Sequence, residues 1–318
     1  MDMFIEILKA FFIGVVEGIT EWLPISSTGH MILVDEFVKL NVSPEFLELF
    51  LVVIQLGAIM AVLILYFHKL NPFSPRKTAP EKRGTWRLWG MVAIGCIPAA
   101  AIGLTLDDFF NEYFYNAWTV AVALIVYGVV FILLERRNRK REAAWLASRG
   151  PRASRGAHAR PLPVGPGDDG DDAEAALFRV RTVDEIDWKT ALKIGCFQML
   201  AIIPGTSRSG STIIGGMLCG CSRTAAAEFT FFLAIPVMFG WGVLKLIKYI
   251  LAVGLAMTAT EIAVLVVGIV TAFVVSVISI KFLMGYIKKN DFTAFGVYRI
   301  IVGIVVLAYF GVKVLLAA

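Results

Sequence analysis

Six stretches of this sequence are apolar over enough residues to cross a lipid bilayer, which takes roughly 17–25 mostly apolar residues. They are residues 46–67, 86–105, 117–134, 225–250, 261–283 and 297–316. Of the 318 residues, 58% are hydrophobic and only 17% are charged, whereas a soluble domain is nearer half apolar and a quarter charged. We therefore predict an all-α polytopic membrane protein. This excludes a cytosolic enzyme, a disulfide scaffold and a disordered protein.

The excess of basic residues predicts orientation rather than a nucleic-acid partner. The net charge is +5, and Lys and Arg cluster in residues 68–87, 135–141 and 281–289. With six crossings, these clusters all fall on one face, which we expect to be cytoplasmic. Both termini then lie outside, and we expect no nucleic acid to bind.

Two further apolar stretches, residues 3–35 and 190–221, are interrupted in the middle. The interruptions read EWLPISSTGH at 21–30 and IPGTSRSGST at 203–212. Pro ends a helix, and Ser or Thr beside Gly suits the start of a new one. Each stretch is therefore predicted to be a re-entrant helix–break–helix segment. Irregular backbone at membrane depth is tolerated only where protein buries it or where it lines a watery cavity.

The two interrupted stretches resemble each other. At an offset of 181 residues, several positions match: Gly14 with Gly195, Glu17 with Gln198, Ser26 with Ser207, and Gly29 with Gly210. Each half of the chain then holds one broken segment and three spans, and because three is odd the second half is inverted relative to the first. In folds of this kind, polar sites meet near the membrane midplane.

This repeat divides the chain into three parts. Residues 1–134 form the predicted first repeat, and residues 190–318 form the second. Residues 135–189 form a cytoplasmic, partly disordered linker, because 142–187 is rich in Arg, Pro, Gly and Asp and has almost no large apolar residues.

The first break combines carboxylates with hydroxyls. Glu17 and Glu21 are four residues apart and share a helix face, where two buried charges repel unless a cation joins them. That cation is either a divalent metal or Arg208, and a purely structural Glu–Arg pair stays open. Ser26, Ser27 and Thr28 offer a nucleophile or phosphate-oxygen donors. Beside them, Gly29 permits close backbone approach, and His30 suits proton transfer.

The second break supplies hydrogen-bond donors around one guanidinium. Arg208 is flanked by Ser207, Ser209, Gly210 and Thr212. Arg grips phosphate with two parallel hydrogen bonds, and a helix N-terminus extends such an anion cradle. Together the breaks fit phosphoryl transfer at the membrane.

Three motifs carry a resemblance to a known family. EGITEWLPISSTGH at 17–30, PGTSRSGST at 204–212 and FTAFGVYRIIVG at 292–303 resemble the undecaprenyl-pyrophosphate phosphatases, also called bacitracin-resistance proteins. The resemblance implies a multi-pass enzyme of the bacterial plasma (inner) membrane, with undecaprenyl pyrophosphate and membrane lipid as partners. Such an enzyme removes one phosphate from this pyrophosphate, so that the lipid carrier is recycled for cell-wall synthesis.

The resemblance also implies roles for single residues, and they agree with the chemistry above. Glu21, Ser27, His30 and Arg208 are expected to be catalytic. Glu17 and Glu21 are expected to bind a divalent cation, Mg²⁺ or Ca²⁺. The expected substrate-binding residues are Ser26, Thr28, Gly29, Ser207, Ser209, Gly210 and Thr212.

Several alternatives stay open at the level of sequence. Ser27 attacks phosphorus after Glu21 or His30 takes its proton, or water attacks directly and Ser27 is only a ligand. The two breaks are expected to meet at a cavity that opens toward the outer, periplasmic face. A transporter that flips the lipid carrier without cleaving it is the rival function, since inverted repeats are typical of transporters. Homodimer formation is also open.

Overall fold

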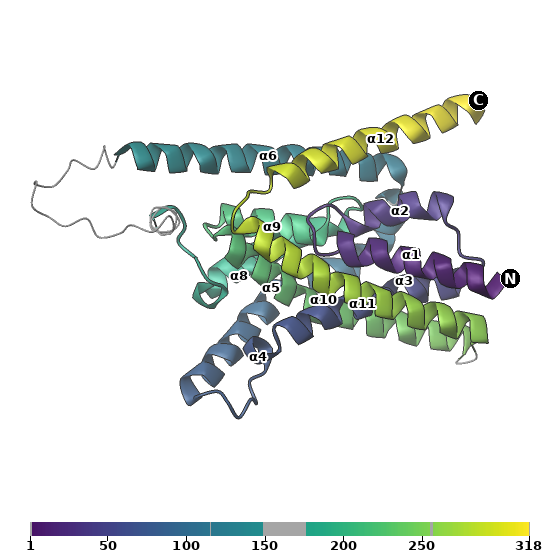
Figure 1. Ribbon diagram of the computed structural model, residues 1–318, viewed down its shortest axis with the longest axis horizontal. Helices are drawn as coiled ribbons and strands as arrows, with labels where there is room; N and C mark the ends of the chain where they lie inside the picture. The colour runs from purple at the N-terminus through teal and green to yellow at the C-terminus, as the bar shows by residue number, and fades with distance from the viewer. Residues whose placement is uncertain (1, 115, 149–175, 255–256, 318) are drawn as a thin grey trace, which may run out of the picture.

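The computed structural model describes residues 2–114, 116–148, 176–254 and 257–317, and this part of the chain is almost wholly helical (Figure 1). In chain order the helices are α1 (Asp2–Thr20), α2 (Ser27–Phe37), α3 (Pro44–Leu65), α4 (Phe67–Leu70), α5 (Ala79–Phe114), α6 (Ala117–Ser148), η1 (Val183–Glu185), α8 (Trp188–Met199), η2 (Leu200–Ile202), α9 (Arg208–Leu218), α10 (Arg223–Val253), α11 (Ala259–Ile287) and α12 (Thr293–Ala317).

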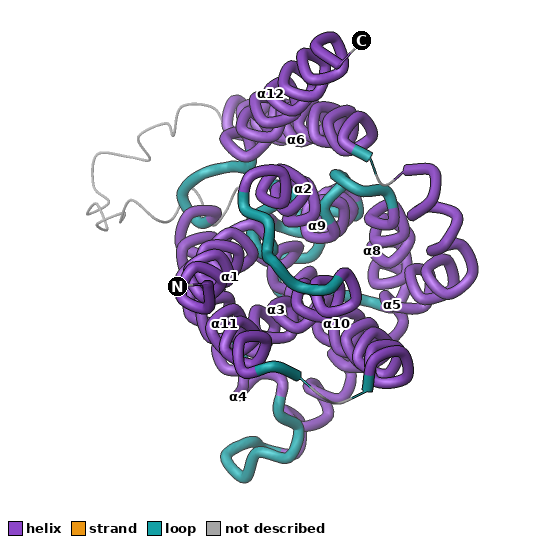
Figure 2. Tube along the Cα trace, turned by 90° about the vertical axis from the view of Figure 1, so that its right-hand side faces the viewer, coloured by secondary structure: helices purple, strands orange, loops and turns teal. Residues whose placement is uncertain are grey.

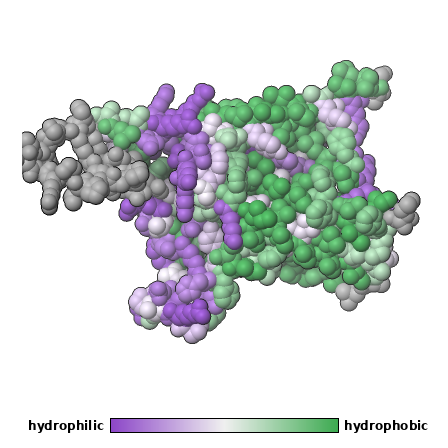
Figure 3. Space-filling view, viewed as in Figure 1, coloured by the Kyte–Doolittle hydropathy of each residue, from purple (hydrophilic) through white to green (hydrophobic). Residues whose placement is uncertain are grey.

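Six helices in the described ranges are long and apolar enough to span a membrane: α3, α5, α6, α10, α11 and α12. They coincide with the six predicted stretches, so the prediction of an all-α polytopic membrane protein is confirmed. The surface agrees, because hydrophobic residues cover most of the visible face and hydrophilic ones gather mainly at one end (Figure 3). The basic end of α6 reaches this polar end (Figure 1).

Helices extend into both ends of the predicted linker, residues 135–189. Residues 135–148 continue α6, because Glu, Arg, Lys and Ala end the apolar stretch but are all good helix formers. After the linker, Phe178 and Val180 are buried, and the Val180 N–H donates to the Gly220 carbonyl at 3.1 Å. The sequence predicts 142–187 to be the mobile part, and of these residues 149–175 lie outside the described ones.

Viewed from the end that holds both termini, the helices form pairs around a centre (Figure 2). α1 packs along α11, α5 along α8, α6 along α12, and α3 along α10. The two short helices that follow the breaks, α2 and α9, lie among these pairs (Figure 2). The breaks themselves are therefore held inside the bundle.

Glycines let several of these pairs approach to backbone contact. A Cβ on Gly14 of α1 would lie 2.9 Å from the Gly268 carbonyl oxygen of α11, which real Cβ atoms do not tolerate. A Cβ on Gly195 of α8 would likewise collide with the carbonyl of Gly95 in α5. Small residues at such seams are how helices pack closely in membranes.

Candidate functional site

The two breaks have the same backbone conformation. Ser26 and Ser207 begin the helices after the breaks and have φ of 76° and 71°. They are the only residues other than glycine with positive φ in the described ranges. The Ser26 Oγ accepts the Gly29 N–H at 3.3 Å, and the Ser207 Oγ accepts the Gly210 N–H at 3.1 Å. Ser is a favoured N-cap, and this bond holds each strained turn in place.

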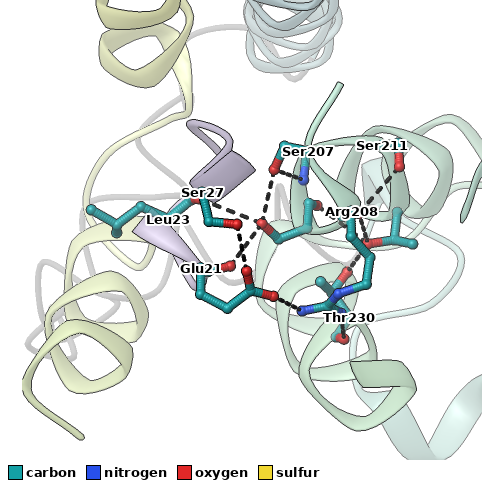
Figure 4. A network of polar contacts seen from close by, with 10 residues as sticks. Glu21, Leu23, Ser27, Ser207, Arg208, Ser211 and Thr230 are labelled. Atoms are coloured by element: carbon teal, nitrogen blue, oxygen red, sulfur yellow. Dashed lines mark hydrogen bonds and ion pairs between the residues drawn. The ribbon is translucent and has the colours of Figure 1, made fainter. Parts of the chain in front are cut away.

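The breaks meet at an ion pair between Glu21 and Arg208 (Figure 4). Arg208 Nη2 donates to Glu21 Oε1 at 2.8 Å, and the Ser27 hydroxyl donates to the other oxygen, Oε2, at 2.6 Å. The Glu21 side chain is only 9% exposed and that of Arg208 only 13%. One carboxylate thus orients both the guanidinium and the hydroxyl.

Hydroxyls of the second break tie this cluster to the surrounding backbone. The Ser209 Oγ donates to the Glu21 carbonyl at 3.1 Å and lies 3.1 Å from the Ser207 Oγ. Arg208 Nη1 donates to the Thr230 carbonyl of α10 at 3.1 Å. Thr212 is completely buried and donates to the Arg208 carbonyl at 2.8 Å. The Thr212 hydroxyl therefore helps to fix the backbone of Arg208.

A cavity of about 170 Å³ opens at this cluster. Of the predicted site residues, Glu21, Ser27, Thr28, Ser207, Arg208 and Ser209 line it. Gln55 of α3 and Trp241 of α10 also line it, although neither was predicted from the sequence. An acidic residue, a hydroxyl and a guanidinium that face one small cavity can bind an anion and remove a proton beside it.

His30 points elsewhere. Its Nδ1 lies 2.7 Å from the Ser26 carbonyl oxygen, and its Nε2 lies 2.8 Å from the hydroxyl of Tyr298 in α12. Both ring nitrogens therefore have partners, and His30 does not line the cavity. The structure places it beside the first break and against α12, without a hydrogen bond to Ser27 or Glu21.

Residues 10–305, which include both breaks, match the family described as bacitracin resistance protein BacA. The chain belongs to this family. Relatives in the family are similar over almost the whole chain. An undecaprenyl-diphosphatase of Desulfitobacterium hafniense is 52% identical over 98% of this chain and 99% of its own length. One of Enterococcus faecalis is 51% identical over 96% of this chain and 98% of its own. One of Acetivibrio thermocellus is 51% identical over 96% of this chain and 98% of its own length.

A second arginine of this BacA-family chain holds both breaks, and it was not among the predicted site residues. Arg299 of α12 is fully buried and donates to Pro24 O of the first break at 3.1 Å. Its Nη2 donates to the carbonyls of Gly205 and Thr206 in the second break at 2.8 and 2.9 Å. The sequence did hold a signal, because a lone Arg inside an apolar span is costly and usually functional.

Glu17, the second predicted metal ligand, is 1% exposed, and its Oε1 has no hydrogen-bond partner. A buried carboxylate oxygen without a hydrogen-bond partner can coordinate a hard cation such as Mg²⁺ or Ca²⁺. No group of three acidic, His or Cys side chains lies together in the described residues. Glu17 and Glu21 are the carboxylates that would hold such a cation, but Glu17 does not line the cavity and both oxygens of Glu21 already accept hydrogen bonds.

Proposed function

We propose that this protein hydrolyses undecaprenyl pyrophosphate to undecaprenyl phosphate and inorganic phosphate, and so recycles the lipid carrier for cell-wall synthesis. The relatives that cover almost the whole chain carry the name undecaprenyl-diphosphatase. The observation that carries the proposal is the cluster of Ser27, Glu21 and Arg208 at one cavity. It provides a nucleophile, a base and a phosphate-binding cation.

We further propose that α1–α2 and α8–α9 are re-entrant pairs and that the two halves of the chain are inverted repeats. Two observations support this. Ser26 and Ser207 share one unusual backbone conformation. The pair α1 and α11 is matched by α8 and α5, with Gly14 and Gly195 at the contacts. Transport of the lipid carrier, the rival function, stays a prediction.

The proposed location is the inner membrane, with the cavity accessible from the outer face. Support for the orientation comes from the polar end of the molecule, where α6 carries the basic run at 135–141 (Figures 1 and 3). Basic residues near membrane spans favour the cytoplasmic side. The two termini lie at the other end of the bundle (Figure 1).

The proposed reaction begins with the pyrophosphate in the cavity. Arg208 binds oxygens of the terminal phosphate, while the Ser27 Oγ passes its proton to Glu21 Oε2 across the 2.6 Å hydrogen bond. A bond forms between Oγ and the terminal phosphorus, and the bond from phosphorus to the bridging oxygen breaks, so undecaprenyl phosphate leaves. Water then attacks the seryl phosphate and loses a proton, Ser27 regains one, and inorganic phosphate is released.

The geometry favours Glu21 over His30 as the proton acceptor. Glu21 already accepts the hydrogen bond of the Ser27 hydroxyl, whereas both nitrogens of His30 are engaged elsewhere. Direct attack by water, with Ser27 as a ligand, uses the same base. A divalent cation held by Glu17 and Glu21 would supply neutralisation of phosphate charge.

The test is phosphate release from undecaprenyl pyrophosphate by the purified chain in detergent, with Mg²⁺ or Ca²⁺ added and with EDTA. We expect the chain to be active with a metal, and Ser27→Ala to lose at least ~10³-fold if Ser27 is the nucleophile. Ser148→Ala, at the exposed end of α6, is the matched control. Substantial activity in Ser27→Ala would favour water attack, and no release by the folded wild-type chain would overturn the phosphatase.

A further inference from the structure

A second cavity, of about 390 Å³, lies at the polar end of the molecule and shares no lining residue with the first. α6 forms one wall and the end of α9 another, and Leu177 and Arg179, which follow the linker, also line it. Its polar side chains are those of Arg137, Asn138, Arg141 and Arg179, together with the thiol of Cys219, and no acidic residue lines it. We call it the arginine cavity.

The three arginines differ from their neighbours in having no acidic partner. At the same end, Arg139 pairs with Asp291, and Arg223 pairs with Glu135. No carboxylate in the described ranges lies within ion-pair distance of the guanidiniums of the arginine cavity. Arg179 has a longer-range electrostatic interaction with Asp187, which does not line the cavity.

Most donor atoms of these guanidiniums are free for a ligand. Arg141 Nη2 donates to the Leu177 carbonyl at 2.9 Å, and Arg179 Nη2 donates to the Thr190 hydroxyl at 2.7 Å. These two bonds hold the Arg141 and Arg179 side chains in place at the cavity wall. Arg137 and Arg141 are four residues apart and so share one face of α6.

A buried donor at the same wall also lacks a partner. Asn138 is only 6% exposed, and its Nδ2 has no hydrogen bond. A buried donor that is left unpaired costs roughly 1–3 kcal/mol, so an acceptor in the cavity would remove a penalty. This second observation points to a ligand that carries hydrogen-bond acceptors.

The end of α9 opposes an anion only weakly. A helix C-terminus carries roughly half a negative charge, which is small against three guanidiniums. Its last carbonyls are also capped, since Cys219, Cys221 and Gly220 donate to Gly215, Gly216 and Met217. The charged side chains that line the arginine cavity are therefore all positive.

We propose that the arginine cavity binds a phosphate group. Guanidinium groups match phosphate oxygens with two parallel hydrogen bonds, and Asn138 adds a neutral donor. The group comes either from the head of an anionic phospholipid, as basic pockets beside membrane spans bind, or from free phosphate. This site is separate from the proposed catalytic cavity and does not depend on the proposed reaction.

The lipid source is tested by native mass spectrometry of the full chain in detergent, titrated with phosphatidylglycerol and, in parallel, with zwitterionic phosphatidylcholine. We expect saturable binding of phosphatidylglycerol, weakened at least ~10-fold in the double variant Arg137→Ala/Arg141→Ala. The matched control is Arg136→Ala/Lys140→Ala, which removes the same charge at the same spacing from the face of α6 that does not line the cavity. It should change affinity less than ~2-fold. Asn138→Leu keeps every charge and should weaken binding several-fold.

The free-phosphate source is tested by calorimetric titration with inorganic phosphate. An Arg208→Ala background is used there, so that the first cavity does not contribute. Binding of either probe with the variant pattern above supports the site and identifies the source. Equal weakening by the two double variants would show diffuse surface charge only and overturn the proposal. Saturable binding of neither probe to the folded chain would overturn it as well.

Discussion

The first and second breaks have one backbone design and opposite chemistry. In both, a serine at positive φ caps the next helix and accepts the N–H of a glycine three residues on. The first break presents Glu21 and Ser27, whereas the second presents Arg208 and Ser209. A repeated turn thus sets the geometry, and the residues around it divide the work between an acidic half and a basic half.

The helices that follow the two breaks differ in burial. In α9, every residue from Ser209 to Met217 is buried. In α2, Gly29 is the only buried residue among those whose side chains the structure describes. α9 is therefore embedded in the bundle, while α2 lies at its edge, although Glu21 in the first break is itself only 8% exposed. This contrast suggests binding by the second break and bond making by the first, which the following predictions test.

The largest effects should come from removing the charges of the central pair. Arg208→Ala should lower kcat/KM roughly 10³-fold, mainly through a higher KM, because it removes the phosphate-binding cation. Glu21→Gln should lower it as much, mainly through kcat, because it removes the base. Steady-state phosphate release at varied substrate measures both. If both variants change kcat and KM in the same way, the second break does not act mainly in binding and the first mainly in catalysis.

Loss of the arginine that joins the breaks should be next in size. Arg299→Met leaves the carbonyls of Pro24, Gly205 and Thr206 without their donor. We expect about 10²-fold lower kcat with little change in KM, since the two halves lose their alignment. Arg299→Lys should recover part of the loss. A helix-content spectrum and a thermal unfolding curve separate misalignment from unfolding. An Arg299→Met protein with full kcat would contradict the positioning role.

A metal effect should distinguish Glu17 from Gln198, the residue 181 positions further on that the proposed repeat pairs with it. Glu17→Gln makes the two halves alike at this position, and we expect it to raise the Mg²⁺ or Ca²⁺ concentration for half-maximal activity about 10-fold. Gln198→Ala, the control, should leave the metal requirement unchanged. Activity measured across a metal titration provides the answer. An unaltered requirement in Glu17→Gln would remove this residue from the metal site.

The smallest effects should come from the two capping serines, and they should be equal. Ser26→Ala or Ser207→Ala loses the cap and places alanine at positive φ, so each should lower the free energy of unfolding by about 1–2 kcal/mol. Glycine at either position should cost less, because it adopts this conformation freely. Denaturant unfolding of the four variants measures the differences. Unequal costs at the two positions would show that the breaks are not equivalent devices.

The sequence predicted the helices well because apolar length and Pro–Gly interruptions are local features. It placed spans at 117–134 and 86–105, but α6 and α5 extend beyond them to Ser148 and Phe114. In α6 the apolar stretch ends at a run of charged residues, but Arg, Lys, Glu and Ala favour helix, so the end of a membrane span need not be the end of a helix.

The site was predictable only where its residues lie in the motifs. Glu21, Ser27 and Arg208 do come together, as their chemistry suggested. The hydrogen bond between His30 and Tyr298 joins α2 to α12 and could not be read from the spacing of His30 and Ser27. Gln55 and Trp241 come from separate spans, so only the packing of α3 and α10 brings them to the cavity.

The glycine seams decide which parts of this protein can move together. With Gly14 against Gly268 and Gly195 against Gly95, the first helix of each broken segment packs with its backbone close to that of a spanning helix. Such surfaces resist sliding. We therefore expect that, if the cavity at Glu21 and Arg208 widens, α1 moves together with α11 and α8 together with α5, while Arg299 links the breaks that these pairs carry.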